Sequence, residues 1–415
     1  MPISLLHAQF LRRRRTVIKK IALDQLEPGM YVHDLNVDWM AHPFLRKRFL
    51  IQDEAAVSKI RAAGIHELYI DTARGDDVPD ALTEAQVRRS VETEMLKVAE
   101  EPPPAPLTSS LAEEMSRATR IYEAASQAVR DVMRDVRLGK AVEVAEVESV
   151  VEDITSSVVR NNGALISLLR LKTADDYTFL HCVAVGTLMV TFTRALGLDA
   201  DTVRQSGIGG LMHDLGKMKV PDAVLNKPGK LTDEEFALIK RHPEAGHALL
   251  VEAGGIGPIP LDITLHHHER IDGSGYPSKL PGDRITLLAK MSAIVDVYDA
   301  ITSDRCYHRG MEPTDALRKM FEWSKFHFEE RLVHQFMRTI GIYPVGTLVK
   351  LESGRLGVVI EQTEGNLLAP RVRAFFSTRS NLYTTPEVLD LTCGADRILN
   401  HELPEQWGVD PRRFL

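Results

Sequence analysis

The spacing of hydrophobic and polar positions divides the chain into segments of different character. Between residues 17 and 77 the apolar residues come in short runs, such as 30–32 and 68–70, next to turn-forming residues. Short runs of this kind predict strands. Asp53 is placed to cap a helix that Gly64 would end. We therefore expect a small α+β domain at 17–77, after a disordered extension at 1–16.

Residues 78–110 predict a polar helix and a stiff linker. Thr83 and Gln86 have the spacing of a capping box, and the tract EPPPAP at 101–106 cannot continue a helix. Apolar side chains then recur at three- and four-residue steps from Leu111 to Val136. This stripe predicts a connecting helix at 111–140. We favour packing on its own domain, and the alternative is a coiled coil that forms a homodimer.

Helical periodicity dominates residues 141–340, where Thr232 and Glu235 form another capping box. After residue 341 the texture changes to alternating β-branched residues with glycines between them, as at 346–351 and 357–360. The expected architecture is multidomain: a central all-α helical bundle at 141–340, the α+β domain before it, and a small β-rich module at 341–415.

Composition is that of a soluble globular protein. The 415 residues are 44% hydrophobic and 26% charged, and the net charge of −7 gives no reason to expect capture of a nucleic acid polymer. Three distant cysteines without CxxC spacing argue against disulfides and thiolate zinc sites. No apolar run approaches the ~18 residues of a membrane span, and the N-terminal basic cluster follows the apolar part, unlike a secretory signal. We expect a cytoplasmic protein.

Histidine and aspartate recur through the helical segment. They form five clusters: His181; His213 and Asp214; His242; His266, His267 and His268; and Asp296. Imidazole and carboxylate together suit iron, manganese or zinc. A lone helical histidine is usually structural, but five clusters in one segment are harder to attribute to chance. Because a carboxylate can bridge two cations, Asp214 suggests paired metals, which hydrolyse phosphodiesters.

Two basic residues and one turn are candidates for substrate contacts. Lys217 follows Asp214 by three positions, so on a helix it lies near the same face. It would contact a phosphate, or else be an ordinary solvated lysine. Arg305 could hold a phosphate in a bidentate manner. Gly273 and Gly275 would let backbone approach a ligand closely, or simply form a turn.

Together these residues resemble the HD-GYP phosphodiesterases, a branch of the HD superfamily of metal-dependent phosphohydrolases. The resemblance covers roughly half the chain. It rests on YTFLH at 177–181, HDLGK at 213–217, KPG at 227–229, HPEAG at 242–246, HHERIDGSGYP at 267–277 and DVYDA at 296–300, followed by Arg305 and Tyr307. The segment PGMYV at 28–32 also resembles a small domain of unknown role found ahead of HD-GYP domains.

The resemblance implies hydrolysis of cyclic di-GMP to pGpG, and on to GMP in a second step, by a metal-activated hydroxide. Two divalent ions, iron or manganese, are implied, because Tyr177 stands where three-metal members carry a further carboxylate. The alternative is a third, weakly held ion, because Asp175 and Asp176 are close in the sequence. The implied metal ligands are His181, His213, Asp214, His242, His267, His268 and Asp296. His266 is left outside, since successive helix positions point about 100° apart.

The resemblance also implies roles around the substrate. The implied substrate-binding residues are Lys217, Asp272, Gly273, Gly275, Tyr276, Arg305 and His308, and the implied catalytic residues are Asp214, Lys217 and Asp175. Helix capping is an equal alternative for Asp175. Cys306 and His308 stand where proline and lysine are usual, which predicts weaker or pH-dependent binding. Glu269 is expected to support a ligand histidine or to pair with Arg270.

Implied partners are cyclic di-GMP itself and a diguanylate cyclase or other signalling protein. The alternative function is a receptor or scaffold that binds cyclic di-GMP, or a protein partner, without turnover. A third hypothesis keeps the chemistry and replaces the substrate by another cyclic dinucleotide or a nucleotide monophosphate ester. The segment 275–277 makes this third hypothesis the weaker one.

Overall fold

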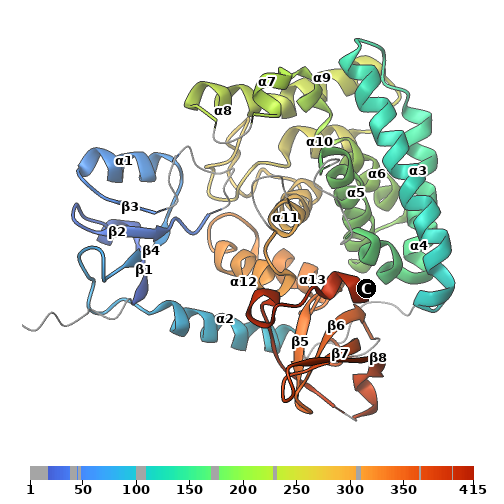
Figure 1. Ribbon diagram of the computed structural model, residues 1–415. Helices are drawn as coiled ribbons and strands as arrows, with labels where there is room; N and C mark the ends of the chain where they lie inside the picture. The colour runs from blue at the N-terminus through green and yellow to red at the C-terminus, as the bar shows by residue number, and fades with distance from the viewer. Residues whose placement is uncertain are drawn as a thin grey trace, which may run out of the picture. The chain divides into compact units, whose positions relative to one another are not determined.

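The computed structural model describes residues 17–37, 44, 48–99, 109–169, 177–227, 231–304, 310–363, 366–394 and 396–415. The chain forms two compact units, residues 1–90 and 91–415 (Figure 1). The division falls within helix α2 (Glu84–Ala99), which begins at the predicted capping box of Thr83 and Gln86.

The first unit is a four-stranded antiparallel sheet with one helix. The strand order is β1 (Ile18–Ala22), β4 (Glu67–Asp71), β2 (Tyr31–Asp34) and β3 (Phe49–Leu50). Helix α1 (Glu54–Ala62) is capped by Asp53, which accepts a hydrogen bond from the Ala56 amide. It buries Val57 and Ile60 in the core of the sheet. The predicted α+β fold is confirmed.

The second unit is built on helices. A long hairpin of α3 (Leu111–Arg137) and α4 (Val144–Leu169) lies along one side of it in Figure 1. The apolar stripe of α3 is buried, including Ala118, Ala125 and Val129, because α3 packs on α4 and α5. The remaining helices are α5 (Tyr177–Ala195), α6 (Ala200–Met212), η4 (Leu215–Lys219), α7 (Asp222–Leu225), α8 (Asp233–Ile239), α9 (His242–Ala253), α10 (Pro258–His266), α11 (Leu287–Thr302), α12 (Pro313–Trp323) and α13 (Glu330–Ile340).

Helix α5 is the central helix of this unit, because α4, α6, α11 and α13 all pack on it. Its segment Thr178–Ala195 has a mean hydropathy of 1.3 and is long and apolar enough to cross a membrane. Of that segment, 78% is buried inside the protein. The sequence prediction that no apolar run approaches this length was wrong, since a helix enclosed on all sides needs no polar face.

The chain ends in a five-stranded antiparallel sheet. The order is β8 (Leu382–Asp390), β7 (Arg371–Ser377), β6 (Arg355–Glu361), β5 (Leu348–Leu351) and β9 (Ile398–His401), followed by α14 (Pro404–Trp407). Side chains on the two faces of the sheet form separate apolar clusters. The predicted β-rich module is confirmed, and it continues the same compact unit as the helices.

Helix α4 bends at Asn161, whose backbone is extended (φ −159°, ψ 106°). The Asn161 amide group is fully buried and donates to the Ser109 carbonyl at 3.0 Å and to Glu361 Oε1 at 3.3 Å. Its own oxygen accepts from the Gly163 amide at 2.9 Å. One side chain therefore connects α4, the start of α3 and strand β6.

Candidate metal centre

All seven predicted metal ligands lie together at the ends and inner faces of the central helices. His181 comes from α5, His213 and Asp214 from the end of α6, His242 from the start of α9, His267 and His268 from the end of α10, and Asp296 from α11. Their potential ligand atoms form three overlapping groups, each within 4.8 Å: His242, His267 and His268; His181, His213 and Asp296; and His213, Asp214 and His267.

Two glycines allow the segment that carries His213 and Asp214 to pack closely against the segment that carries His242. The turn η4 packs directly on α9, and Gly216 faces Gly246 across this contact. A Cβ atom on Gly216 would lie 1.9 Å from the His242 carbonyl oxygen and 2.5 Å from the Gly246 nitrogen. Since heavy atoms cannot approach so closely, residue 216 has to be glycine for Asp214 and His242 to meet.

Hydrogen bonds fix the orientation of the histidine rings. Nδ1 of His213 lies 2.7 Å from the Gly210 carbonyl, Nδ1 of His242 lies 2.8 Å from the Ile239 carbonyl, and Nδ1 of His267 lies 3.0 Å from the Thr264 carbonyl. Because a carbonyl oxygen only accepts, we assign the proton of each ring to Nδ1. The Nε2 atom of each neutral ring then presents a lone pair to the centre.

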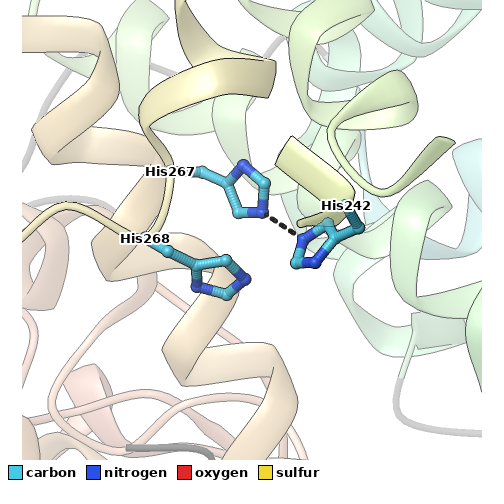
Figure 2. A group of neighbouring side chains, drawn as sticks. All are labelled: His242, His267 and His268. Atoms are coloured by element: carbon cyan, nitrogen blue, oxygen red, sulfur yellow. Dashed lines mark hydrogen bonds between the residues drawn. The ribbon is translucent and has the colours of Figure 1, made fainter. Parts of the chain in front are cut away.

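These lone pairs converge without a proton between them. The Nε2 atoms of His242 and His267 are only 3.1 Å apart (Figure 2). Buried atoms without a hydrogen-bond partner among the described residues include His213 Nε2, His268 Nε2 and Asp214 Oδ1. Buried polar atoms are rarely left unsatisfied, and metal-bound imidazoles commonly donate their other N–H to a carbonyl or carboxylate. The centre therefore has the donor set and the unsatisfied atoms of a site for metal cations.

The two carboxylates lie among different imidazoles. Asp296 Oδ1 is 2.9 Å from His181 Nε2 and 3.7 Å from His213 Nε2. Asp214 Oδ1 is 3.2 Å from His242 Nε2, while Asp214 Oδ2 is 3.4 Å from His213 Nε2. The two oxygens of Asp214 therefore face different histidines, as a bridging carboxylate requires.

The electrostatics keep the centre in the protonation state that metal ligands need. Burial lowers the pKa of His242, and lowers that of His267 and His268 well below the ordinary value. For Asp214, burial raises the pKa, but Lys217 and His213 outweigh this and hold it well below the usual range. His242, His267 and His268 are thus neutral and the Asp214 carboxylate is ionised at neutral pH.

His181 differs from the other histidines. Its Nδ1 atom lies 2.7 Å from Asp299 Oδ2, so a carboxylate holds this ring instead of a carbonyl. Burial lowers the pKa of His181, but the hydrogen bonds with Asp296 and Asp299 outweigh it and raise the pKa. Sequence reasoning gave Asp299 no role, although its spacing of three from Asp296 places both on one side of a helix.

Lys217 lies within η4, and its ammonium is 2.5 Å from Asp214 Oδ2. The predicted proximity to the metal face is confirmed, and the ammonium rests on a carboxylate of the centre. Tyr276 stacks on His268 with ring centroids 4.6 Å apart. The loop that carries Tyr276 therefore touches the imidazole cluster directly.

The loop from Asp272 to Tyr276 is shaped by hydrogen bonds within the protein and by its two glycines. Asp272 accepts a hydrogen bond from the Ser274 amide, and Gly273 adopts a left-handed conformation with φ +75°. A Cβ atom on Gly275 would lie 2.4 Å from the Arg270 nitrogen. Gly275 is thus required because the backbone at residue 275 lies close to the backbone at Arg270.

Glu269 does not support the histidines in the predicted way. Its Oε1 and Oε2 atoms accept hydrogen bonds from the Ser278 and Leu280 amides, at 2.7 and 3.0 Å. It therefore anchors the far end of the same loop. His266 pairs with Asp262 through Nδ1, outside the centre, as predicted. The predicted residues Asp175, Arg305 and His308 lie outside the described residues.

Comparison with known proteins agrees with this geometry. Residues 156–332 match the HD domain family, and residues 18–147 match a domain of unknown function, DUF3391. A cyclic di-GMP phosphodiesterase of Pseudomonas aeruginosa is 44% identical over 395 residues, which cover 94% of each chain. The chain belongs to the HD-GYP family of phosphodiesterases.

Two further relatives match a shorter part of the chain. A cyclic di-GMP phosphodiesterase response regulator of Xanthomonas campestris is 39% identical over 150 residues, 34% of this chain and 38% of that protein. A 3′3′-cGAMP-specific phosphodiesterase of Vibrio cholerae is 34% identical over 158 residues, 37% of this chain and 36% of that protein. The relatives thus bear names that specify two different cyclic dinucleotides.

Proposed function

We propose that this HD-GYP protein hydrolyses cyclic di-GMP to pGpG and then, by a second cleavage, to GMP. The observation that supports the chemistry most is the convergence of unprotonated Nε2 atoms on the carboxylates, with His242 and His267 only 3.1 Å apart. The full-length similarity to a relative named for cyclic di-GMP hydrolysis supports the substrate. We also expect this reaction in the cytoplasm.

The proposed cofactor is a pair of divalent ions, iron or manganese. His181, His213 and Asp296 would hold one ion, and His242, His267 and His268 the other, with Asp214 between them. Such ions supply a water of lowered pKa and stabilise the charge that develops on the attacking and leaving oxygens. Histidine and carboxylate ligands without cysteine suit this choice of metals.

The proposed roles of the protein groups follow from their positions. Lys217 would contact a non-bridging phosphate oxygen and limit the negative charge on Asp214, beside which it lies. Asp299 would keep the Nε2 lone pair of His181 directed into the centre. From the sequence we retain the roles of Arg305 and His308 at the ligand and of Asp175 as a candidate catalytic residue near the reacting phosphate, with helix capping as its alternative.

In the test, His266, which lies outside the centre, serves as the control for its neighbour His267, a proposed metal ligand. Protein purified without oxygen and loaded with ferrous iron or manganese is incubated with cyclic di-GMP, and the products are separated by chromatography. We expect pGpG and GMP, loss of at least about 100-fold in kcat/KM in Asp214→Ala and His267→Ala, and near wild-type activity in His266→Gln. Full activity in Asp214→Ala would contradict the mechanism.

The same assay separates the competing functions. Stoichiometric binding of cyclic di-GMP without product in every metal form would favour a receptor or scaffold over an enzyme. Since one relative is named for 3′3′-cGAMP, that nucleotide is assayed in parallel. A higher kcat/KM for 3′3′-cGAMP than for cyclic di-GMP would keep the chemistry and change the substrate.

A further inference from the structure

The loop that carries Tyr276 folds back on one buried carboxylate. Glu269 is 2% exposed, and its Oε1 and Oε2 atoms accept hydrogen bonds from the Ser278 and Leu280 amides at 2.7 and 3.0 Å. The Tyr276 amide donates to the His268 carbonyl at 3.2 Å, and the two rings are stacked. The outgoing and returning parts of the loop are therefore held to two consecutive residues, a potential metal ligand and its neighbour.

Lys279, which lies between the two amides that Glu269 binds, has an unusual backbone conformation. Its φ of +51° lies in the left-handed region. Among the described residues, the other non-glycine residues with positive φ are Asn36 and Asn381, and asparagine adopts this conformation more readily than lysine does. The Lys279 side chain is exposed, so its burial does not stabilise the conformation. Another interaction has to do so.

The Glu269 carboxylate provides that interaction. Amides on either side of a left-handed residue form a concave site for an anion, and here each carboxylate oxygen accepts from one of the two amides. Hydrogen bonds to a charged group are stronger than those between neutral groups. Without the carboxylate, Lys279 would return to a more common conformation. The chain direction between Tyr276 and Leu280 would then change, and Tyr276 would leave the His268 ring.

We propose that Glu269 is a positioning residue for the substrate: it holds Lys279 in the left-handed conformation and thereby keeps Tyr276 on His268, where the nucleotide binds. This inference rests on the proposed hydrolysis of a cyclic dinucleotide and on the expected contact of Tyr276 with it. Because Glu269 acts through the loop, its loss should affect KM far more than the metal content.

The experiment removes the anchor and then relieves the strain that the anchor offsets. Glu269→Gln keeps the size of the side chain but leaves one oxygen to accept from two amides. It is combined with Lys279→Gly, which tolerates positive φ, and separately with Lys279→Ala, which removes the same charge but keeps the Cβ atom. Metal content, kcat and KM for cyclic di-GMP, and its Kd by calorimetry are measured on each protein.

A matched control tests the loss of a buried carboxylate elsewhere. Glu114 is also fully buried, and its two oxygens accept from Ser157 and Arg160 within the α3–α4 hairpin. Glu114→Gln therefore removes the same kind of group without touching the loop. It should keep the wild-type KM for cyclic di-GMP even where it lowers the Tm.

We expect Glu269→Gln to raise KM and Kd for cyclic di-GMP at least about tenfold, the size of a lost hydrogen bond to a charged group. Metal content should stay at the wild-type level. Adding Lys279→Gly should recover part of the loss, whereas adding Lys279→Ala should not. Equal recovery by both, or by neither, would overturn the role of the left-handed conformation. Loss of metal together with affinity would show that Glu269 supports the metal centre instead.

A second variant carries the test if Glu269→Gln fails to fold. Lys279→Val alters an exposed side chain, and a β-branched residue is strongly disfavoured at positive φ. It should raise KM for cyclic di-GMP with normal metal content, while Lys279→Gly alone should keep the wild-type KM. An unchanged KM in Lys279→Val would overturn the inference.

The proposed function and this inference fail in different ways. Unchanged KM and Kd in Glu269→Gln, with an active wild type, would overturn the positioning role alone. A wild type that binds cyclic di-GMP without cleaving it would contradict the proposed hydrolysis, and a tenfold weaker Kd in Glu269→Gln would still support the positioning role. A wild type that binds no cyclic di-GMP would overturn both.

Discussion

At the scale of single residues, the chemistry of the centre depends on what holds the far nitrogen of each ring. Three imidazoles donate Nδ1–H to backbone carbonyls, and His181 is held by the carboxylate of Asp299. A carbonyl fixes the tautomer but adds no charge, whereas a carboxylate also makes the ring more basic. His181 should therefore be the most strongly donating imidazole of the four.

We predict that Asp299→Ala weakens metal binding by about 10- to 100-fold, because the His181 ring loses its orientation and its basicity. Metal retention is measured by competition with a chelator, and the remaining metal by elemental analysis. Asp262→Ala is the matched control, since it removes the same kind of carboxylate from Nδ1 of His266 outside the centre. Equal metal affinity in the two variants would contradict the role of Asp299.

A second prediction concerns acid and the metal-free protein. Burial lowers the pKa values of His242, His267 and His268 below the ordinary 6.5. As the pH falls through about 6.5, these histidines bind protons in the unfolded chain but stay neutral in the folded protein. The free energy of unfolding therefore decreases. His181, whose pKa is raised, contributes stability on acidification and offsets part of this decrease.

We therefore expect the Tm of chelator-treated protein to fall between pH 7 and pH 5, by about 2–4 °C for each 1 kcal/mol lost. Carboxylates with lowered pKa values contribute only below about pH 4, outside this window. The measurement is calorimetry at several pH values, with metal-loaded protein alongside. A Tm that stays constant or rises on acidification would contradict the expectation that the lowered pKa values of His242, His267 and His268 outweigh the raised pKa of His181.

At the scale of elements, the site is assembled where short turns meet helix starts. Gly216 in η4 lies against the start of α9, with Gly246 one turn further along that helix. This contact, and not a long helix–helix interface, brings Asp214 to His242. The elements η4 and α9 can thus pack this closely because neither Gly216 nor Gly246 has a side chain.

We predict that Gly216→Ala separates η4 from α9 and removes most metal binding and activity, with a loss of about 1–3 kcal/mol in stability from overpacking. Gly246→Ala provides a graded comparison, because its Cβ atom would lie 3.0 Å from Thr264 Cγ2 and 3.1 Å from the Gly216 nitrogen. It should cause a smaller loss. Metal content and urea unfolding are measured together. Normal metal content in Gly216→Ala would contradict this account.

Local signals made several elements predictable from the sequence. The capping boxes at Thr83 and Thr232 and the cap at Asp53 are all observed. Each of these depends on residues within one turn, as does the alternation that predicted β5 and β6. Residue types and motif spacing likewise identified the seven residues that the fold gathers.

Contacts between distant segments were not predictable in the same way. The bend at Asn161 depends on Ser109 and Glu361, which lie far away in the chain. The hydrogen bond from the Ser278 amide to Glu269 and the contact of Asp299 with His181 likewise form only when the chain is folded. The sequence shows which residues are polar, but the hydrogen-bond partner of each one depends on how distant segments pack in the folded protein.

At the scale of the whole molecule, the helices and the C-terminal sheet of the second unit share buried polar contacts. Asn161 reaches Glu361 of β6, and Thr314 of α12 lies 3.4 Å from Thr347, just before β5. Buried hydrogen bonds of this kind are costly to leave unsatisfied. We therefore expect the two parts to unfold as one cooperative body.

We predict that Asn161→Ala lowers the free energy of unfolding by about 1–3 kcal/mol for each buried group left without a partner. Circular dichroism at 222 nm follows the helices, and Trp407 emission, in a Trp39→Phe, Trp323→Phe background, follows the sheet. Both midpoints should shift together, and the neighbouring half-buried Asn162 provides a control as Asn162→Ala. A shift in only one signal would show independent unfolding.

Because residue 216 must lack a side chain, a single mutation at this position is enough to disrupt the metal centre during evolution. Every amino acid that replaces glycine carries a Cβ atom, and at this position that atom would collide with the His242 carbonyl. A lineage could therefore lose the centre in one mutational step while every histidine and aspartate stays in place. A genome survey that looks only for those ligands would count such a protein as active, and reading residue 216 as well would separate the two cases.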